Sequence, residues 1–205
     1  MTGAVIERPA PRSAQPARAE TSAFVKGPVL DLRRICILVV EDARFMSGIV
    51  TSVLKALGIG RMLTADSVEQ ARDILNASMA LSAASGRSDV DIVLANWELP
   101  NDGGADLLRW MRECEDEALR FMPVIAMSSY PEERVVCLAR DLGANEFIAK
   151  PFSVTSLCGR LLSIINQPRP FVKAPGFFGP DRRRKVEPFD GGERRRKLKV
   201  KENHE

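Results

Sequence analysis

The sequence ICILVVED, residues 35–42, decides the fold. Its six apolar residues form an unbroken run, which is typical of a strand that is buried on both faces of a parallel sheet. The run stops at two carboxylates, Glu41 and Asp42. Apolar residues then recur at helical spacing as far as Gly58, which is a natural helix stop. This stretch therefore predicts a buried strand followed by a helix.

Four further strand-and-helix pairs follow along the chain. The expected strands are the apolar runs at 62–65, 90–95, 124–127 and 147–149. The expected helices lie at 67–79, after Gly104, at 132–142 and at 153–165. Residues 82–89 have the composition of a turn. Because right-handed crossovers place helices on both faces of a parallel sheet, the pattern predicts a doubly wound α/β fold with five parallel strands.

The length of 205 residues allows one domain of ordinary size with additional segments. Residues 1–33, rich in Pro, Ala and Arg, predict a disordered leader, and residues 34–166 form the expected domain. Residues 167–205 hold 12 Lys and Arg against 6 Asp and Glu, and we expect a basic tail that is disordered without a ligand.

Composition excludes several classes of protein. No stretch reaches the ~20 apolar residues that a membrane-spanning helix needs. The four cysteines show no C-x-x-C spacing, and scattered thiols of this kind fit a cytoplasmic protein. A Ser/His/Asp set and a phosphate-binding P-loop signature are both missing from the sequence, so we do not expect an enzyme.

Polar residues stand at the carboxyl ends of the predicted strands, where open parallel sheets bind their ligands. These residues are Glu41, Asp42, Asn96, Ser128 and Lys150. Hard carboxylate oxygens suit Mg²⁺, and a lysine with a hydroxyl suits the oxygens of a phosphoryl group. The pattern predicts one site for a divalent cation and a phosphoryl group at this edge of the sheet.

At these residues the chain resembles the receiver domain of bacterial response regulators, with a flavodoxin-like or CheY-like fold. The matching stretches are ILVVED at 37–42, DIVLANWELPNDGG at 91–104, PVIAMSS at 123–129 and GANEFIAKPF at 143–152. The resemblance implies that Glu41 and Asp42 are the Mg²⁺-binding acidic pair. It implies that Ser128 is the switch hydroxyl, that Lys150 contacts the phosphoryl group, and that Phe147 is the rotating aromatic residue.

One position departs from the family pattern. The family's phosphoacceptor is an aspartate at the end of the third strand, where this chain has Asn96. A neutral amide is a very poor nucleophile, so we expect no aspartyl phosphorylation and a weakened Mg²⁺ site. Glu98 and Asp102, on the following loop, are alternative acceptors. The alternative is that Asn96 only keeps the pocket inactive, through a hydrogen bond to Lys150 or Ser128.

The resemblance also implies how such a chain acts. We expect a two-component, phosphorelay-type signalling protein without an attached output domain, which binds a signalling or motility protein. In the family, the face built from the fourth helix, fifth strand and fifth helix makes the output contacts.

The tail contains an internal repeat. GPDRRRK at 179–185 recurs twelve residues later as GGERRRK at 191–197, and Phe177 and Phe189 precede the two copies at the same offset. Guanidinium groups bind phosphate and the edge of guanine, and they stack on bases, as Phe does. The arrangement resembles the arginine-rich extensions of single-domain receivers that bind cyclic di-GMP. The candidate ligands of this messenger are Arg182, Arg183, Arg184, Arg194, Arg195 and Arg196. Nucleic-acid binding through the tail is a further alternative, which the interspersed acidic residues disfavour.

Overall fold

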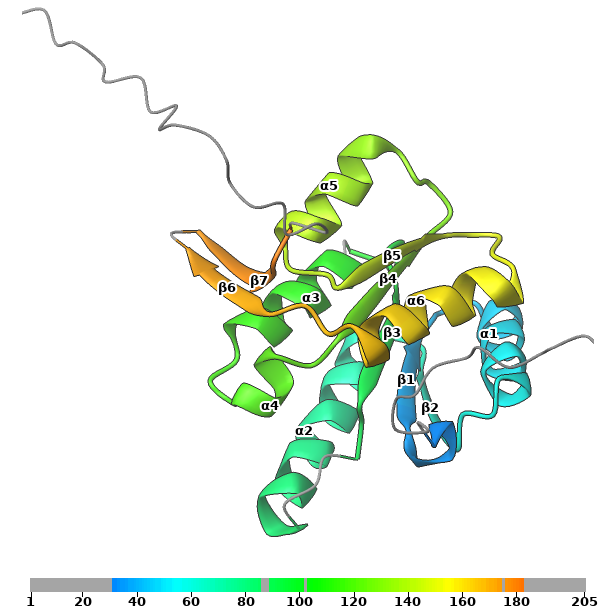
Figure 1. Ribbon diagram of the computed structural model, residues 1–205, viewed down its shortest axis with the longest axis horizontal. Coiled ribbons are helices and arrows are strands. Elements are labelled where there is room, and N and C mark those ends of the chain that lie inside the picture. The colour runs from blue at the N-terminus through cyan, green and yellow to red at the C-terminus, as the bar shows by residue number, and fades with distance from the viewer. Residues whose placement is uncertain (1–30, 86–88, 102, 175, 183–205) are drawn as a thin grey trace, which may run out of the picture. The chain divides into compact units, whose positions relative to one another are not determined.

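The computed structural model describes residues 31–85, 89–101, 103–174 and 176–182 (Figure 1). A five-stranded parallel sheet has the order β2-β1-β3-β4-β5. The strands are β1 (Cys36–Val40), β2 (Arg61–Ala65), β3 (Ile92–Asn96), β4 (Val124–Ser128) and β5 (Glu146–Ala149). The predicted doubly wound α/β fold is confirmed.

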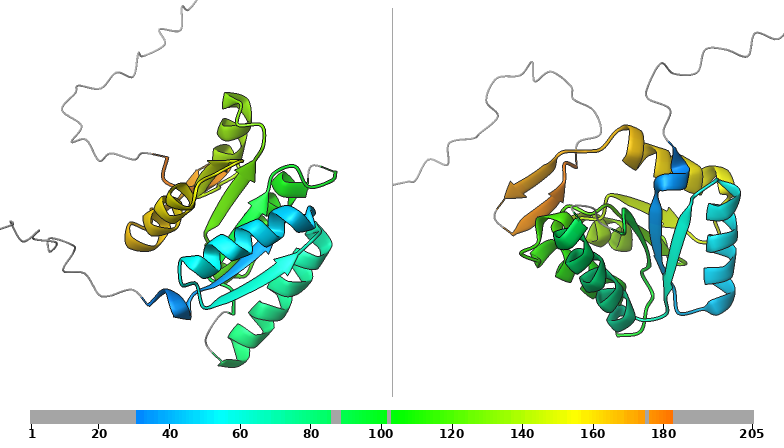
Figure 2. Two further views of the ribbon diagram at one scale, coloured as in Figure 1. Left: turned by 90° about the vertical axis from the view of Figure 1, so that its right-hand side faces the viewer. Right: turned by 90° about the horizontal axis from the view of Figure 1, so that it is seen from below.

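Helices cover both faces of this sheet (Figure 2). They are α1 (Arg44–Ala56), α2 (Val68–Ser85), α3 (Gly103–Glu113), α4 (Glu117–Arg120), α5 (Glu133–Asp141) and α6 (Val154–Asn166), with a 3₁₀ turn η1 at Leu32–Arg34. Within the described ranges, no helix has the length and apolar composition needed to cross a bilayer.

The apolar residues of the central strands divide between two cores because successive side chains point to opposite faces. Ile37 and Val39 of β1 pack with α1 and α6, where Leu54 and Leu157 are fully buried. Leu38 and Val40 face the other way, into a core shared with α2, α3, α4 and α5. The strands β1, β3 and β4 are buried along their whole length, which explains their continuous apolar runs.

Two local features differ from the expectation. Helix α2 continues to Ser85, so the prediction of a turn at 82–89 was wrong for its first four residues. Ala and Ser allow a helix to continue, since neither residue breaks it as Gly or Pro does. The short helix α4 was not predicted, and its start is capped by Asp116, whose side chain accepts a hydrogen bond from Leu119 N.

A C-terminal hairpin was also not predicted. The antiparallel strands β6 (Phe171–Ala174) and β7 (Phe177–Pro180) lie in the segment expected to be a basic tail. Phe171 and Phe178 form a three-ring cluster with Phe121, which follows α4, at centroid distances of 5.0 to 5.4 Å. This cluster gives the hairpin an apolar anchor on the α/β domain.

Glycines allow the hairpin to approach the domain closely. Gly143, at the end of α5, has a φ of +95°, and a Cβ there would lie 2.7 Å from the carbonyl oxygen of Phe178. A Cβ at Gly179 would in turn lie 2.7 Å from Gly143 Cα. Strand β7 therefore contacts the backbone that links α5 to β5.

Arg112 of α3 holds this region together from inside. Arg112 is only 6% exposed, and its Cζ atom lies 5.1 Å from the ring centroid of Phe171. Its guanidinium donates to the carbonyl oxygens of Gly143, Arg120 and Met122 and to Asn145 Oδ1, at 2.9 to 3.1 Å. Burial lowers the pKa of Arg112 to about 9, so the group is still a cation at neutral pH. Carbonyl and amide oxygens therefore stabilise a buried charge here.

Replacing Arg112 tests this role. Arg112→Met leaves several buried acceptors without a donor, each of which costs ~1–3 kcal/mol. We expect the free energy of unfolding, measured by urea denaturation, to fall by at least ~2 kcal/mol. Arg109→Met is the matched control because Arg109, on the same helix, forms only an exposed ion pair with Asp106. The control should change stability by less than ~0.5 kcal/mol, and an equal effect of both variants would contradict the role of Arg112.

Candidate functional site

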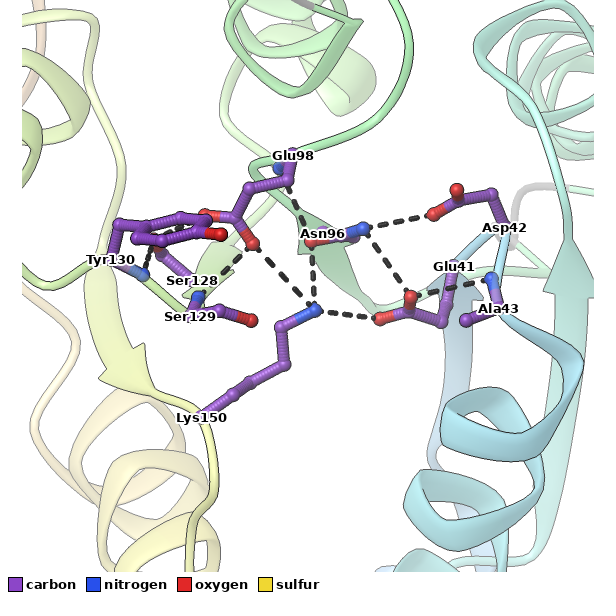
Figure 3. Close-up of polar contacts among 9 residues, drawn as sticks. All are labelled: Glu41, Asp42, Ala43, Asn96, Glu98, Ser128, Ser129, Tyr130 and Lys150. Atoms are coloured by element: carbon purple, nitrogen blue, oxygen red, sulfur yellow. Dashed lines mark hydrogen bonds and ion pairs between the residues drawn. The ribbon is translucent and has the colours of Figure 1, made fainter.

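The five polar residues predicted at the strand ends lie together (Figure 3). Asn96 and Ser128 are the last residues of β3 and β4, Glu41 and Asp42 follow β1, and Lys150 follows β5. These four strands are neighbours in the sheet, so their carboxyl ends place the side chains in one pocket. Glu41, Asn96 and Ser128 are each at most 3% exposed.

Asn96 bridges the acidic and basic sides of the pocket. Its Nδ2 donates to Asp42 Oδ1 at 2.9 Å and to Glu41 Oε1 at 3.3 Å. Its Oδ1 accepts from Lys150 Nζ at 2.8 Å and from the backbone N–H of Glu98 at 3.1 Å. The expected hydrogen bond to Lys150 is present, whereas the alternative partner, Ser128, bonds elsewhere.

The partners of Asn96 fix the orientation of its amide. In the opposite orientation, Nδ2 would face the two donors, Lys150 Nζ and Glu98 N, and Oδ1 would face two carboxylates. The carboxylates Glu41 and Asp42 thus meet an N–H donor, and a donor cannot coordinate a cation. No cluster of three or more His, Cys, Asp or Glu side chains able to hold a metal occurs among the described residues. In this arrangement Asn96 Nδ2 already donates to both carboxylates of the acidic pair, so a Mg²⁺ ion would have to displace these hydrogen bonds.

Lys150 lies at the centre of the pocket (Figure 3). Its side chain is 7% exposed and its Nζ is 3.1 Å from Glu41 Oε2, a carboxylate that is 2% exposed. A second carboxylate oxygen, Glu98 Oε2, lies 3.8 Å from Nζ. A buried ammonium is stable only when it is paired and hydrogen-bonded, and here Glu41, Asn96 and Glu98 supply those contacts.

Glu98 takes part in the pocket in a way that the sequence did not indicate. Its carboxylate accepts a hydrogen bond from Ser128 Oγ and a 3.0 Å hydrogen bond from the backbone N–H of Ser129. We expected Glu98 only as a replacement acceptor. Its position two residues after Asn96, on a loop leaving the same edge of the sheet, was the one available signal. The other replacement acceptor, Asp102, lies outside the described residues.

A close approach between helix and strand supports the loop that carries Glu98. A Cβ at Gly104, in the first turn of α3, would lie 2.6 Å from the carbonyl oxygen of Asn96. The backbone N–H of Trp97 also donates to Met127 O at 2.7 Å. The chain directly after Asn96 is therefore held by both α3 and β4, which directs Glu98 toward Ser128.

Two further predicted site residues, Phe147 and Arg182, lie away from this network. Phe147, on β5, is half-buried and packs against the core shared by α2, α3 and α5. Arg182 forms a 3.2 Å ion pair with Asp141 of α5, and its guanidinium lies 4.1 Å from the ring centroid of Phe177. The other five arginines of the triplets, Arg183, Arg184, Arg194, Arg195 and Arg196, lie outside the described residues.

Comparison with known proteins gives a family match. Residues 37–162 match the response regulator receiver domain. The chain is 30% identical over 131 residues to the chemotaxis protein CheY-3 of Vibrio cholerae, covering 64% of this chain and 92% of the relative. It is 27% identical to the chemotaxis protein CheY of Pseudomonas aeruginosa, covering 64% of this chain and 96% of the relative.

Solved structures share the same fold. A chain in the CheX-CheY-BeF3-Mg²⁺ complex of Borrelia burgdorferi superposes with a TM-score of 0.55 at 22% identity, covering 66% of this chain and 98% of that one. The chemotaxis response regulator CheY4 of Vibrio cholerae superposes with a TM-score of 0.51 at 18% identity, covering 63% and 98%.

The hydrogen bonds of the Asn96 amide lead to a prediction about stabilisation by Mg²⁺. In Asn96→Asp, a carboxylate oxygen replaces Nδ2 and faces Glu41 and Asp42, so two hydrogen bonds become like-charge contacts. In EDTA we expect this variant to unfold ~1–3 kcal/mol more easily than the wild type. Mg²⁺ should then stabilise it by about 1.4 kcal/mol for each tenfold excess over the dissociation constant.

Asn96→Ala is the control for this experiment because it loses the same hydrogen bonds without adding a charge. Urea denaturation in EDTA and in MgCl₂ measures the difference for all three proteins. The wild type and Asn96→Ala should respond little to Mg²⁺. An equally large Mg²⁺ response in the wild type would show that the amide does not replace the cation.

Proposed function

This chain belongs to the family of response regulator receiver domains, and we propose that it signals by binding a protein partner without phosphorylation of an aspartate. The family match confirms the CheY-like resemblance and places the chain among two-component signalling proteins. Receiver domains typically bind Mg²⁺ at an acidic phosphorylation site. The proposal concerns how this particular site departs from that behaviour.

The observation that carries the proposal is the position of the Asn96 amide. A phosphoacceptor must present a carboxylate oxygen, and Asn96 presents a carbonyl oxygen that is already bonded to Lys150 Nζ and Glu98 N. Its Nδ2 neutralises part of the repulsion between Glu41 and Asp42, for which a Mg²⁺ ion would otherwise be needed. Both the nucleophile and the need for the cation are removed by one substitution.

We propose that partners bind the face that the family uses for output, which here consists of α5, β5 and α6. The predicted helices at 132–142 and 153–165 correspond to α5 and α6. Apolar side chains are exposed on both helices: Leu138 on α5 is 46% exposed, and Val154 and Leu162 on α6 are 47% and 40% exposed. Apolar side chains are enriched in the buried core of protein interfaces, and these three residues are available for such a core. The CheX-CheY complex among the structural neighbours is an example of a protein partner for a related fold.

Treatment with a small phosphodonor tests the proposal. Wild-type protein incubated with acetyl phosphate and Mg²⁺ should show no base-labile phosphoryl adduct by intact mass spectrometry. Asn96→Asp should gain such an adduct, because Lys150, Ser128, Glu41 and Asp42 all remain in place. The adduct should disappear when Mg²⁺ is removed with EDTA.

Asn96→Ala is again the matched control and should stay unmodified. An adduct on the wild type would overturn the proposal, and peptide mapping would then decide between Glu98 and Asp102 as the acceptor. If Asn96→Asp gained no adduct, the pocket would have lost more of its phosphotransfer chemistry than this one carboxylate.

The contacts of Arg182 favour a second candidate function, that of a cyclic di-GMP effector. Arg182 is the first arginine of the first triplet, and it stacks on Phe177, the aromatic residue that precedes the same copy of the repeat. Together with Arg140, Arg169 and the carboxylate-bearing Glu146 it lines a cavity of about 100 Å³ beside Phe147. This volume accommodates one phosphate group of a dinucleotide, so the remaining contacts have to come from the arginine triplets.

Isothermal titration calorimetry of the full-length chain with cyclic di-GMP tests this candidate. Replacing the six arginines at 182–184 and 194–196 by lysine keeps the charge and removes the planar guanidinium groups. We expect saturable binding by the wild type and at least about a tenfold weaker affinity in the lysine variant, equivalent to ~1.4 kcal/mol.

Nucleic-acid binding through the tail gives a different result. General electrostatic binding of nucleic acid would survive the lysine substitutions. Its affinity would fall steeply with salt and would show no preference for guanine. If the titration with cyclic di-GMP gave no heat of binding, the effector function would be excluded and the protein-binding receiver would remain.

A further inference from the structure

Glu98 contacts three groups that together form a binding site for an anion. Ser128 Oγ and the backbone N–H of Ser129 donate to its two carboxylate oxygens, and Lys150 Nζ lies 3.8 Å from Oε2. Ser128 is fully buried and the Lys150 side chain is 7% exposed. Figure 3 shows the carboxylate of Glu98 directed into the pocket toward these donors. A hydroxyl, an amide and an ammonium that converge on one point are the donors that bind an oxyanion.

We infer that this pocket is an oxyanion site and that the carboxylate of Glu98 is its built-in ligand. The resemblance to receivers implies that Ser128 and Lys150 meet a phosphoryl group, and here both meet Glu98 instead. The carboxylate of Glu98 therefore occupies the oxyanion site without any phosphorylation at Asn96. This inference rests on the proposed function, in which Asn96 accepts no phosphoryl group.

The charges in the pocket explain why an external anion does not compete in the wild type. The charged side chains drawn in Figure 3 are Glu41, Asp42, Glu98 and Lys150. They sum to a charge of −2 when all are ionised, so a phosphate ion would enter a region that is already negative. Removing Glu98 reduces this negative charge to −1 and frees Ser128 Oγ and Ser129 N, while Lys150 keeps its contacts with Glu41 and Asn96. The side chain of Glu98 is 27% exposed, so solvent reaches it in this position.

Occupation by Glu98 has consequences for the neighbouring loop. Ser128 Oγ, which donates to Glu98, also accepts from the backbone N–H of Tyr130 at 3.0 Å. The carbonyl oxygen of Ser128 accepts from Lys150 N at 2.6 Å, which joins the ends of β4 and β5. Glu98 thus fixes the first residues of the loop that leads from β4 to α5, where Glu133 begins the helix.

Nuclear magnetic resonance of the full-length chain tests the inference, with inorganic phosphate as the probe. The backbone amide proton of Ser129 should move upfield in both Glu98→Ala and Glu98→Gln, because each variant removes the charge-assisted hydrogen bond. Titration with phosphate should return this resonance downfield in Glu98→Ala. The affinity of Glu98→Ala for phosphate should be at least about tenfold higher than that of the wild type.

Glu113→Ala is the matched control because Glu113 is an exposed glutamate at the end of α3, so its removal changes the net charge equally. The control should leave Ser129 and the weak phosphate response of the wild type unchanged. Glu98→Gln keeps the size of the side chain, so its upfield shift shows that the charge matters. An unmoved Ser129 resonance in both Glu98 variants would overturn the inference, as would equal phosphate affinity in the wild type and Glu98→Ala.

The two proposals fail separately. A phosphoryl adduct on the wild-type chain would overturn the proposed function, whatever the position of the Ser129 resonance. If the wild type takes up no phosphoryl group and the Ser129 resonance is unmoved in both Glu98 variants, the role of Glu98 alone is overturned.

Discussion

The buried ammonium of Lys150 is the interaction on which the polar edge of the sheet depends. It lies close to Asn96 Oδ1, Glu41 Oε2 and Glu98 Oε2, which come from β3, from the end of β1 and from the loop after β3. A cation enclosed to this extent would be unstable without such partners. The carboxyl ends of β1, β3 and β5 are therefore linked through one side chain, although β4 lies between β3 and β5 in the sheet.

Asn96 and Glu98 complete this network in complementary ways. The amide of Asn96 supplies a donor to the acidic pair and an acceptor to Lys150, so one neutral side chain serves groups of both signs. Glu98 supplies the anion that Ser128 and Ser129 require. In our proposal, Asn96 and Glu98 take the places of the cation and the phosphoryl group that a receiver with an aspartate at residue 96 would bind.

Much of this arrangement was predictable from the sequence. The apolar runs predicted the five strands, and residues such as Glu41 and Lys150 could be placed together because they follow neighbouring strands. The role of Glu98 could not be predicted, since it depends on how the loop after β3 is held against α3. The hairpin β6–β7 was equally hidden, because its strands are short and its stability comes from Phe121 and Arg112, distant in the sequence. Local patterns do not encode such partners.

The hairpin also determines where the remaining arginines begin. Strand β7 ends at Pro180, and Arg182 is held at Asp141 of α5, so the chain leaves the domain from a defined point beside that helix. Tethering at such a point makes any second contact intramolecular, with an effective concentration that is ~mM for a short flexible connection. A ligand of modest affinity for the arginine repeat would thereby be concentrated beside α5.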